Sequence, residues 1–513
     1  MNISEGSKYK IGKITHNGDL SVDDEEIKKL IKLKKNQIFN DNEIYKTEGN
    51  IRGFYANRGY FYAHIDHSFN KDVTNGTIDI NFSIQKNHLV YVGSINIDGL
   101  ENTNTSFIKR ELLLKQGDLL EVNKLSRSIQ KLNNLDFIKV VEHHHVPVVA
   151  GGMSDTMDLT FDITESNPAN IFAGFSATGE DWSLCGEVGF EHKNLFGRGQ
   201  TVGVYTQMAK KNKFACGLNW DEPWVLDKNA SLSAGCSYIR HEKDLDDITN
   251  AYKDEKFGVK CIAGHRIDEN MRFSGGYQFE HVRSFDVKEK ARDVTNAYYD
   301  TLKPKDTTKI SSILGDCVYN SMDYYLDPST GNYSRLNAQL ASSLLVGDVN
   351  FLELGGETTW YFPTFWKFVL SIGMEGRMVM PYGDQRQVPM DKRFCYSEDF
   401  VKGYDKKDGI CPKLGGRIKG LMNIECKFPI FPLQDDKTII QGIVFSDIGG
   451  IWNDWKDISF KIGLENNNLH SSLGFGIRVM TAFFAHPLRF NTAWGFNHFD
   501  SNKKHWSLSI STK

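Results

Sequence analysis

The 513-residue sequence has no long hydrophobic run, no excess of basic charge and no apolar leader. It has no apolar stretch of about 18 residues, which excludes a membrane-spanning helix but not a membrane β-barrel, whose strands need only about 9–11 alternating residues. The formal net charge of -4 excludes the basic surface of nucleic-acid-binding proteins, so we expect no nucleic-acid partner. The opening MNISEGSKYK lacks the apolar core of a secretory signal, which indicates a removed leader or a fragment.

Motifs for catalysis and metal binding are also missing. The sequence has no phosphate-binding GxxxxGK[ST] loop, HExxH zinc motif or nucleophile elbow, so we expect neither an enzyme nor a cofactor. The 8 cysteines are scattered without CxxC spacing, which argues against a zinc site or a disulfide scaffold. The one metal-like cluster is EHHH at residues 142–145, where alternation puts only His143 and His145 on one strand face. We expect an exposed strand there rather than a metal site.

Residues 8–166 contain one pattern twice. Each copy begins with an alternating strand, continues through two helical segments and ends with two strands. In the first copy, acidic residues lead the first helical segment and lysines follow, as the helix dipole favours. The sequence therefore predicts two α+β modules of order β-α-α-β-β, at residues 8–86 and 88–166, each with the size of a small domain.

From residue 169 onward the pattern becomes strand and turn. In residues 473–479 apolar side chains alternate with glycine and arginine, and residues 488–497 repeat this alternation. An apolar exterior around a wet lumen produces this pattern. The pattern predicts an antiparallel transmembrane β-barrel over residues 169–513, and about 344 residues divided among about 16 strands leave about 21 for each strand and its connection, which fits such a barrel. The alternative, a soluble β-sandwich or propeller, would leave the in-strand arginines and glutamates unpaired in a core.

A charged turn within residues 393–404, RFCYSEDFVKGY, is the most informative feature of the barrel region. The lone carboxylates Glu425 and Asp447 follow it in otherwise apolar strands. This pattern indicates a loop that folds inward and is tied by charge to the barrel wall. Cys395 and Cys411 flank the turn in polar sequence and form either a disulfide or two free thiols. The turn consists of Val401, Lys402, Gly403 and Tyr404.

Six segments follow one another along the chain: YVGSINIDGLENTN at 91–104, EHKNLFGRGQ at 191–200, LDPSTGNYSRL at 326–336, VKGY at 401–404, NIECKFPIF at 423–431 and FSDIGGIW at 445–452. Through these segments and their order, nearly the whole sequence resembles the BamA-type outer-membrane assembly factors, in which POTRA modules precede a 16-stranded barrel of the surface-antigen type. The resemblance implies that Lys402 takes the place of the family's loop-tip arginine, with Glu425 and Asp447 as its partners on the barrel wall. An ammonium has no forked donors, so we expect a looser lock than arginine would make.

The resemblance also implies a location and a function. We expect a protein of the bacterial outer membrane, with its modules in the periplasm, that folds and inserts β-barrel proteins without ATP. The implied partners are unfolded outer-membrane β-barrel clients, periplasmic accessory lipoproteins of an assembly complex, and outer-membrane lipid. Clients or lipoproteins would bind along the exposed strand at residues 61–69. Because bacterial members carry three to five modules and a signal peptide, we expect a truncated gene or a fragment.

The expected site of opening is the seam between the first and last barrel strands, because a closed barrel hides every other strand edge. Three alternative functions remain: a two-partner-secretion transporter, a translocation-and-assembly barrel, and a passive porin. A passive porin would not explain the modules. The predicted seam residues are Phe172, Gly174, Phe175, Trp506, Leu508 and Ile510.

Overall fold

A computed structural model of the protein describes most of the chain, which divides into two compact units: residues 1–168 with 196–199, and residues 169–195 with 200–513. The side chains of residues 174–178, 183–185, 243–245, 248–251, 431–432, 438–439 and 505–510 lie outside the description, although their backbone is included. The described residues are 8–19, 24–148, 154–178, 183–209, 213–225, 228–245, 248–289, 307–324, 327–395, 400–404, 410–412, 414–432, 438–463, 467–479, 488–496 and 505–510.

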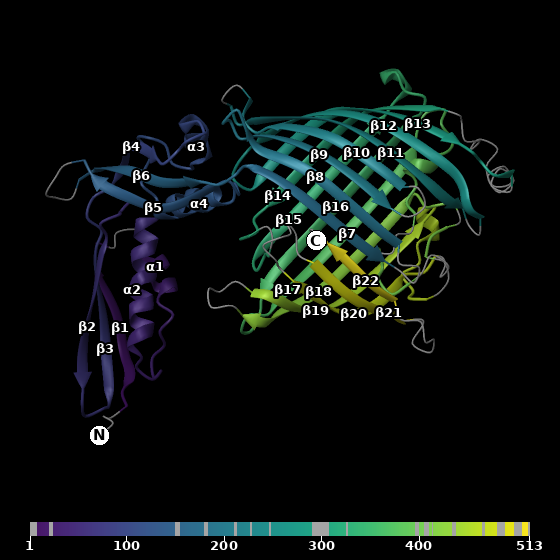
Figure 1. The fold of residues 1–513 in the computed structure, drawn as a ribbon. Coiled ribbons are helices and arrows are strands. Elements are labelled where there is room, and N and C mark those ends of the chain that lie inside the picture. Colours follow the sequence, from purple (N-terminus) through teal and green to yellow (C-terminus); the bar gives the residue numbers. More distant parts are fainter. Residues whose placement is uncertain are drawn as a thin grey trace. The chain divides into compact units, whose positions relative to one another are not determined.

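The first unit contains two β-α-α-β-β modules, as the repeated sequence pattern predicts (Figure 1). In each module the first strand lies parallel to the last, which also pairs antiparallel with the strand before it. The first module consists of β1 (Lys10–Gly18), α1 (Asp24–Leu30), α2 (Asp41–Ala56), β2 (His64–Asp72) and β3 (Thr77–Gln85). The second consists of β4 (Tyr91–Asp98), α3 (Thr105–Glu111), α4 (Val122–Asn133), β5 (Ile138–Pro147) and β6 (Thr156–Glu165).

The core of the first module forms where one face of the sheet meets the apolar face of α2. Strand β3 is buried at alternate positions, so one of its faces points into the core. Helix α2 contributes Ile44, Ile51 and Tyr55 to the same core, at spacings that place them on one helix face. Its N-terminus is capped by the Asn40 side chain, which accepts a hydrogen bond from the Asn42 amide at 3.1 Å.

Both modules repeat one irregularity in their first strand. Strands β1 and β4 each contain a bulge opposite the last strand of the module. A bulge leaves an amide without a ladder partner. In the first module the Lys13 amide donates instead to Asp79 Oδ1 at 2.6 Å, and in the second the Ser94 amide donates to Asp158 Oδ1 at 2.5 Å. The modules therefore share side-chain detail as well as element order.

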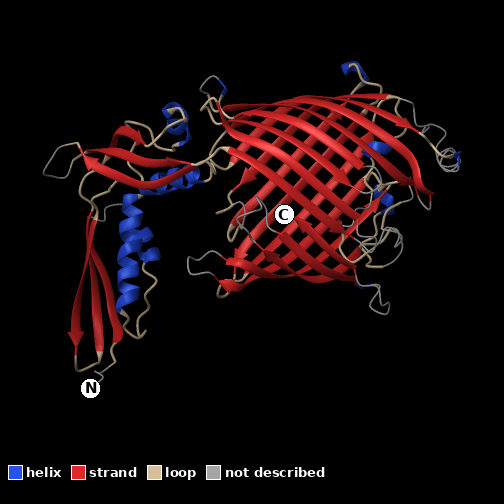
Figure 2. Cartoon of the chain, in the orientation of Figure 1, coloured by secondary structure: helices blue, strands red, loops and turns tan. Residues whose placement is uncertain are grey.

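The second unit is a closed barrel of 16 strands in which each strand pairs antiparallel with its neighbours in sequence (Figure 2). The sequence-based prediction of a 16-stranded antiparallel barrel is confirmed. The strands are β7 (Ala169–Thr178), β8 (Ser183–Leu195), β9 (Gln200–Ala209), β10 (Lys213–Glu222), β11 (Ala230–Leu245), β12 (Ile248–Arg266), β13 (Met271–Phe285), β14 (Thr308–Asn320), β15 (Gly331–Ala341), β16 (Phe351–Pro363), β17 (Val369–Pro381), β18 (Ile418–Pro432), β19 (Thr438–Trp452), β20 (His470–Val479), β21 (Leu488–Gly495) and β22 (His505–Ile510).

The barrel wall has an apolar outer face and a polar inner face. On β20, Phe475 is 55% exposed whereas Arg478 is 8% exposed. Leu473 and Ile477 are exposed together with Phe475, and the positions between them are buried. This inside-out arrangement suits strands with lipid outside and a polar lumen within. Within the described part of the chain, none of the helices has the length and apolar character needed to cross a bilayer.

Two connections between strands enter the barrel interior. Residues 382–417 join β17 to β18 and include the short helix η3 (Met390–Lys392), and residues 321–330 join β14 to β15. Because β14 and β17 run in opposite directions around an antiparallel barrel, these two connections enter from opposite ends. Two further short helices, η2 (Ser343–Leu345) and η5 (Trp455–Asp457), lie in the connections that follow β15 and β19.

Candidate functional site

The tip of the loop at residues 382–417, here called the inward loop, is bound to strand β19 by a charge pair. Lys402 donates from both its backbone amide and its ammonium Nζ to Asp447 Oδ2, each at 3.2 Å. The Asp447 side chain is 1% exposed and that of Lys402 is 21% exposed. Asp447 also accepts a hydrogen bond from Asn423 Nδ2 at 2.5 Å, and the Lys402 ammonium lies 5.0 Å from the Phe445 ring centroid. The lone carboxylate on β19 is therefore a partner of the loop-tip lysine.

Gly403 and Tyr404 attach the loop tip to β20 and β21. The φ angle of Gly403 is +93°, a left-handed conformation that favours glycine, and a Cβ there would approach the backbone of Trp494 to 2.8 Å. Its carbonyl accepts a hydrogen bond from the Gly495 amide at 3.2 Å. The Tyr404 hydroxyl donates to the Ser471 carbonyl at 2.7 Å. The tip thus contacts three consecutive strands near the C-terminus.

The tip is also held by an apolar cluster. Val401 is fully buried, and Phe400 packs beside it. Ile451 on β19 and Ile410 in the same loop complete this cluster. Val401 therefore holds the tip by apolar packing, and Lys402 holds it by its ion pair with Asp447.

The direct ion-pair partner of Glu425 is Arg489 rather than Lys402, although the Lys402 charge also acts favourably on the Glu425 carboxylate. Glu425 Oε2 accepts from Arg489 Nη2 on β21 at 2.6 Å, and both side chains are largely buried. The reason is register: Asp447 lies opposite Asn423, whereas Glu425 lies two residues further along β18. Two residues along a strand correspond to about 6.6 Å. The ammonium that reaches Asp447 therefore leaves Glu425 to the guanidinium of Arg489.

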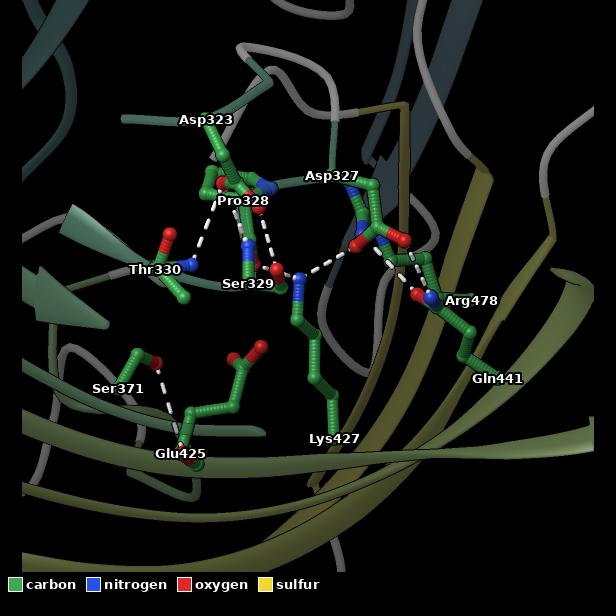
Figure 3. Close-up of polar contacts among 10 residues, drawn as sticks. All are labelled: Asp323, Asp327, Pro328, Ser329, Thr330, Ser371, Glu425, Lys427, Gln441 and Arg478. Atoms are coloured by element: carbon green, nitrogen blue, oxygen red, sulfur yellow. Dashed lines mark hydrogen bonds and ion pairs between the residues drawn. The ribbon is translucent and has the colours of Figure 1, made fainter. Parts of the chain in front are cut away.

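A second polar network joins the β14–β15 connection to β18, β19 and β20 (Figure 3). Asp327 accepts hydrogen bonds from Gln441 Nε2 at 2.7 Å and from Arg478 Nη1 at 2.9 Å, and it pairs with the Lys427 ammonium. Lys427 also donates to the Pro328 carbonyl at 2.5 Å. The sequence drew attention to this segment only through its family resemblance. The charged residues on the inner faces of β18 and β20, Lys427 and Arg478, were the signal that pointed to partners for Asp327.

The seam between β22 and β7 has a short ladder. Between the described residues 169–178 and 505–510 it consists of two residue pairs, Ser507 with Thr178 and Leu508 with Ala177, whereas β7 pairs with β8 along its whole length. Continuing this register would place Ile510 opposite Phe175, but the ladder stops before that pair.

The structure places the predicted seam residues in the first and last barrel strands. Phe172, Gly174 and Phe175 pair with residues of β8, while Trp506, Leu508 and Ile510 pair with residues of β21. Leu508 is the one member of this set that also belongs to the ladder across the seam, in the described part of both strands. The side chains of Gly174, Phe175, Trp506, Leu508 and Ile510 lie outside the described residues.

In the structure no disulfide joins Cys395 to Cys411. The Cys411 thiol donates to the Phe394 carbonyl at 3.5 Å, and the Cys395 thiol lies 3.9 Å from the Arg393 carbonyl. Each thiol therefore points to a backbone acceptor of the inward loop.

One group of metal-ligand residues is present in the described part of the chain, on the second module. Glu142, His144 and Asp162 offer donor atoms within 4.8 Å of one another. His144 Nε2 lies 3.3 Å from a carboxylate oxygen of each acidic residue, and Glu142 and His144 are both exposed. His145 points elsewhere and packs against the Phe61 ring. Ion pairing with His144 accounts for this arrangement, so we assign no metal to it.

Comparisons with known proteins match both units of the chain. A model of the Omp85 superfamily domain matches residues 194–513, and a model of the POTRA repeat, described as a surface antigen variable number repeat, matches residues 9–87 and 90–166. The chain is 25% identical over 439 residues to the outer membrane protein assembly factor BamA of Nitratidesulfovibrio vulgaris, covering 82% of this chain and 53% of that protein. It is 24% identical over 478 residues to BamA of Neisseria meningitidis, covering 88% of this chain and 58% of that protein.

Solved structures share the fold. A crystal structure of BamA from Haemophilus ducreyi lacking POTRA domains 1–3 aligns with a TM-score of 0.61 at 19% identity, covering 98% of this chain and 99% of that chain. CdiB from Escherichia coli aligns with a TM-score of 0.59 at 12% identity, covering 99% of this chain and 91% of that chain. The chain spans little more than half the length of the two BamA relatives. Because the domain model covers more than half of its residues, the chain belongs to the Omp85 superfamily.

Proposed function

We propose that this protein folds and inserts β-barrel proteins into the bacterial outer membrane through the seam between β7 and β22. The observation that carries the proposal is the two-pair ladder at this seam in an otherwise continuous barrel. In lipid an unpaired backbone group has no water partner, so a short ladder is the weakest place in the wall. Once free, the edge of β7 could pair with a client strand by β-augmentation.

The inward loop supports a role in controlling this opening. Its tip is bound to β19, β20 and β21, which directly precede the last strand β22. A movement of the tip would therefore act directly on the strands beside the seam. Insertion of this kind needs no nucleotide or bound cofactor, so the proposed activity is not enzymatic.

The modules would lie in the periplasm and receive clients or accessory lipoproteins. Strand β2 is at the edge of the first module's sheet, where it pairs with β3 on one side and is open on the other. An open edge of this kind can accept an added strand. The names of the BamA relatives support β-barrel proteins as clients, with outer-membrane lipid around the barrel.

Disulfide cross-links across the seam test the proposal. In a variant without the native cysteines, Ala177→Cys with Leu508→Cys joins two residues that face each other across the seam. We expect the oxidised protein to remain folded and to lose insertion of a client barrel into liposomes, and a reductant to restore it. The matched control is Ile477→Cys with Phe490→Cys, two exposed residues that pair between β20 and β21, and this cross-link should leave insertion unchanged.

Export through the lumen, as in a two-partner-secretion transporter, is the competing function. If the seam-linked protein inserts clients at the rate of the reduced protein, lateral opening is excluded and export becomes the better interpretation. Single-channel conductance with and without a client then distinguishes a transporter from a passive pore.

A further inference from the structure

The first half of the inward loop is attached to a different part of the barrel wall from its tip. Lys392 in η3 donates from Nζ to Glu280 Oε2 on β13 at 2.5 Å. Glu280 also pairs with Lys256 on β12, so one carboxylate lies between two ammonium groups. The side chains of Lys392 and Glu280 are 9% and 3% exposed. Neither the sequence pattern nor the resemblance pointed to this pair.

Apolar packing surrounds this attachment. Val388 in the loop is fully buried and belongs to a cluster with Val282 on β13, Phe351 on β16 and Val379 on β17. Phe394 packs against this cluster and also against the cluster that holds the tip. The first half of the loop therefore has its own apolar contacts with the wall, and Phe394 links them to those of the second half.

The charges around Lys392 favour its ionised form. Burial alone would lower the pKa of the Lys392 ammonium, but the Glu280 and Asp391 carboxylates outweigh this effect and raise it. Removing either partner of a buried pair leaves the other charge without compensation, which strongly disfavours the buried arrangement. The pair therefore contributes to holding the loop at the wall and is more than a surface contact.

The two attachments lie on separated parts of the wall. Lys392 binds β13 and Lys402 binds β19, six strands further around a ring of 16. The two lysines of one loop therefore bind strands that are not neighbours in the wall.

We infer that Glu280 is a second positioning residue of the inward loop, and that its pair with Lys392 holds the first half of the loop to the β12–β13 wall independently of the Lys402–Asp447 pair. The loop is thus attached to the barrel wall at two places, to β13 through Lys392 and to β19 through Lys402. Release of the tip beside the seam leaves the first half in place. Only the consequence for client insertion rests on the proposed function. The attachment of the loop to the wall does not depend on that function.

Thiol labelling of the full-length protein tests the inference without a client. In a variant without the native cysteines, Val388→Cys reports on the first half and Val401→Cys on the tip, and both valines are fully buried in the native protein. Glu280→Lys should speed labelling at Val388→Cys about tenfold or more, because a third ammonium replaces the carboxylate that lies between Lys392 and Lys256. Labelling at Val401→Cys should stay within about twofold. Lys402→Glu should speed labelling at Val401→Cys and leave labelling at Val388→Cys within about twofold.

Two controls separate this charge effect from general damage. Asp286→Asn removes an exposed pair with Lys253 beside the end of β13 and should alter neither reporter. Combining Glu280→Lys with Lys392→Glu keeps two positive charges and one negative charge in the cluster and should restore slow labelling at Val388→Cys.

Three results would overturn the inference: unchanged labelling at Val388→Cys in Glu280→Lys, equal acceleration at both reporters, or no restoration by the charge exchange. If Glu280→Lys does not assemble, Glu280→Gln decides the question, and unchanged labelling at Val388→Cys in that variant contradicts the inference. Loss of insertion with slow labelling at both reporters would bear on the proposed function alone.

Discussion

The two lone carboxylates of the barrel lumen, Asp447 and Glu425, have different ion-pair partners. Lys402 carries a compact ammonium and reaches one oxygen of Asp447. Glu425 instead pairs with Arg489, whose guanidinium comes from a strand near the end of the chain. The loop-tip lock is therefore one pair, supported by a backbone hydrogen bond to the same carboxylate.

Lys402→Glu should release the loop tip. A carboxylate at this position would face Asp447 and lose a charge-assisted hydrogen bond worth about 1.5–3 kcal/mol, with repulsion added. We expect the tip to become sensitive to protease, while Lys402→Arg stays protected because it keeps the charge and adds donors. Limited proteolysis of the folded protein in detergent measures both. Protection of the Lys402→Glu tip at the wild-type level would exclude the lock.

Glu425→Gln distinguishes the observed pairs from the predicted three-residue lock. Because Glu425 pairs with Arg489 and Lys402 with Asp447, we expect the substitution to leave the tip protected. Asp447→Asn should expose it. Equal exposure in the two variants would mean that Glu425 also holds Lys402.

At the scale of elements, a carboxylate at the end of β6 organises the turn after β4. The amides of Glu101, Asn102 and Thr103 donate to the Glu165 carboxylate at 3.2, 3.0 and 2.9 Å. Burial alone would raise the pKa of Glu165, but the hydrogen bonds from Thr103, Asn102 and Glu101 outweigh it and lower the pKa below its ordinary value. The ionised carboxylate therefore stabilises the folded turn.

The sign of this pKa shift predicts how the turn responds to pH. A lowered folded pKa means that the stabilisation is present above the ordinary glutamate value of about 4.3 and is lost as the pH falls through the folded value. Glu165→Gln should therefore weaken the turn by about 1 kcal/mol at neutral pH and have little effect at low pH. Amide exchange at Asn102 and Thr103 in the full-length protein, corrected for intrinsic rates, measures the difference. A constant difference across this pH range would contradict the assignment.

At the scale of the whole molecule, lumen contacts connect strands that are distant in the chain. Asp327 joins the β14–β15 connection to three later strands, while the inward loop joins β13 to β19. These contacts enter from opposite ends of the barrel. They supplement the backbone ladders, which connect only neighbouring strands.

The closed barrel should give the full-length protein heat-modifiable mobility. Refolded in detergent, the unheated protein should migrate differently from the boiled protein in a denaturing gel, because a 16-stranded ring resists unfolding until it is heated. Circular dichroism of the unheated sample should be dominated by strand. A helical spectrum, or a monomer that stays in solution without detergent, would contradict the barrel.

Local patterns predicted much of the fold. The period-two alternation of apolar and small or charged residues placed the barrel strands, since side chains on a strand point alternately to lipid and lumen. The predicted ends of the strands were less exact. Strand β2 was expected near residues 61–69 but occupies His64–Asp72, because the chain first completes a turn after α2. A lysine among apolar neighbours and a lone aspartate further along also pointed correctly to a charge pair.

The sequence by itself determined the two modules, the antiparallel barrel and the inward turn, because each depends on the order and period of neighbouring residues. The tertiary structure decided that Arg489 pairs with Glu425 and that Glu280 pairs with Lys392. It also decided that the described residues of β7 and β22 form two residue pairs across the seam. Those contacts depend on which strands face each other across the lumen and on their register. A shift of two residues moves a charge by about 6.6 Å, enough to change its partner while leaving every alternation pattern unchanged.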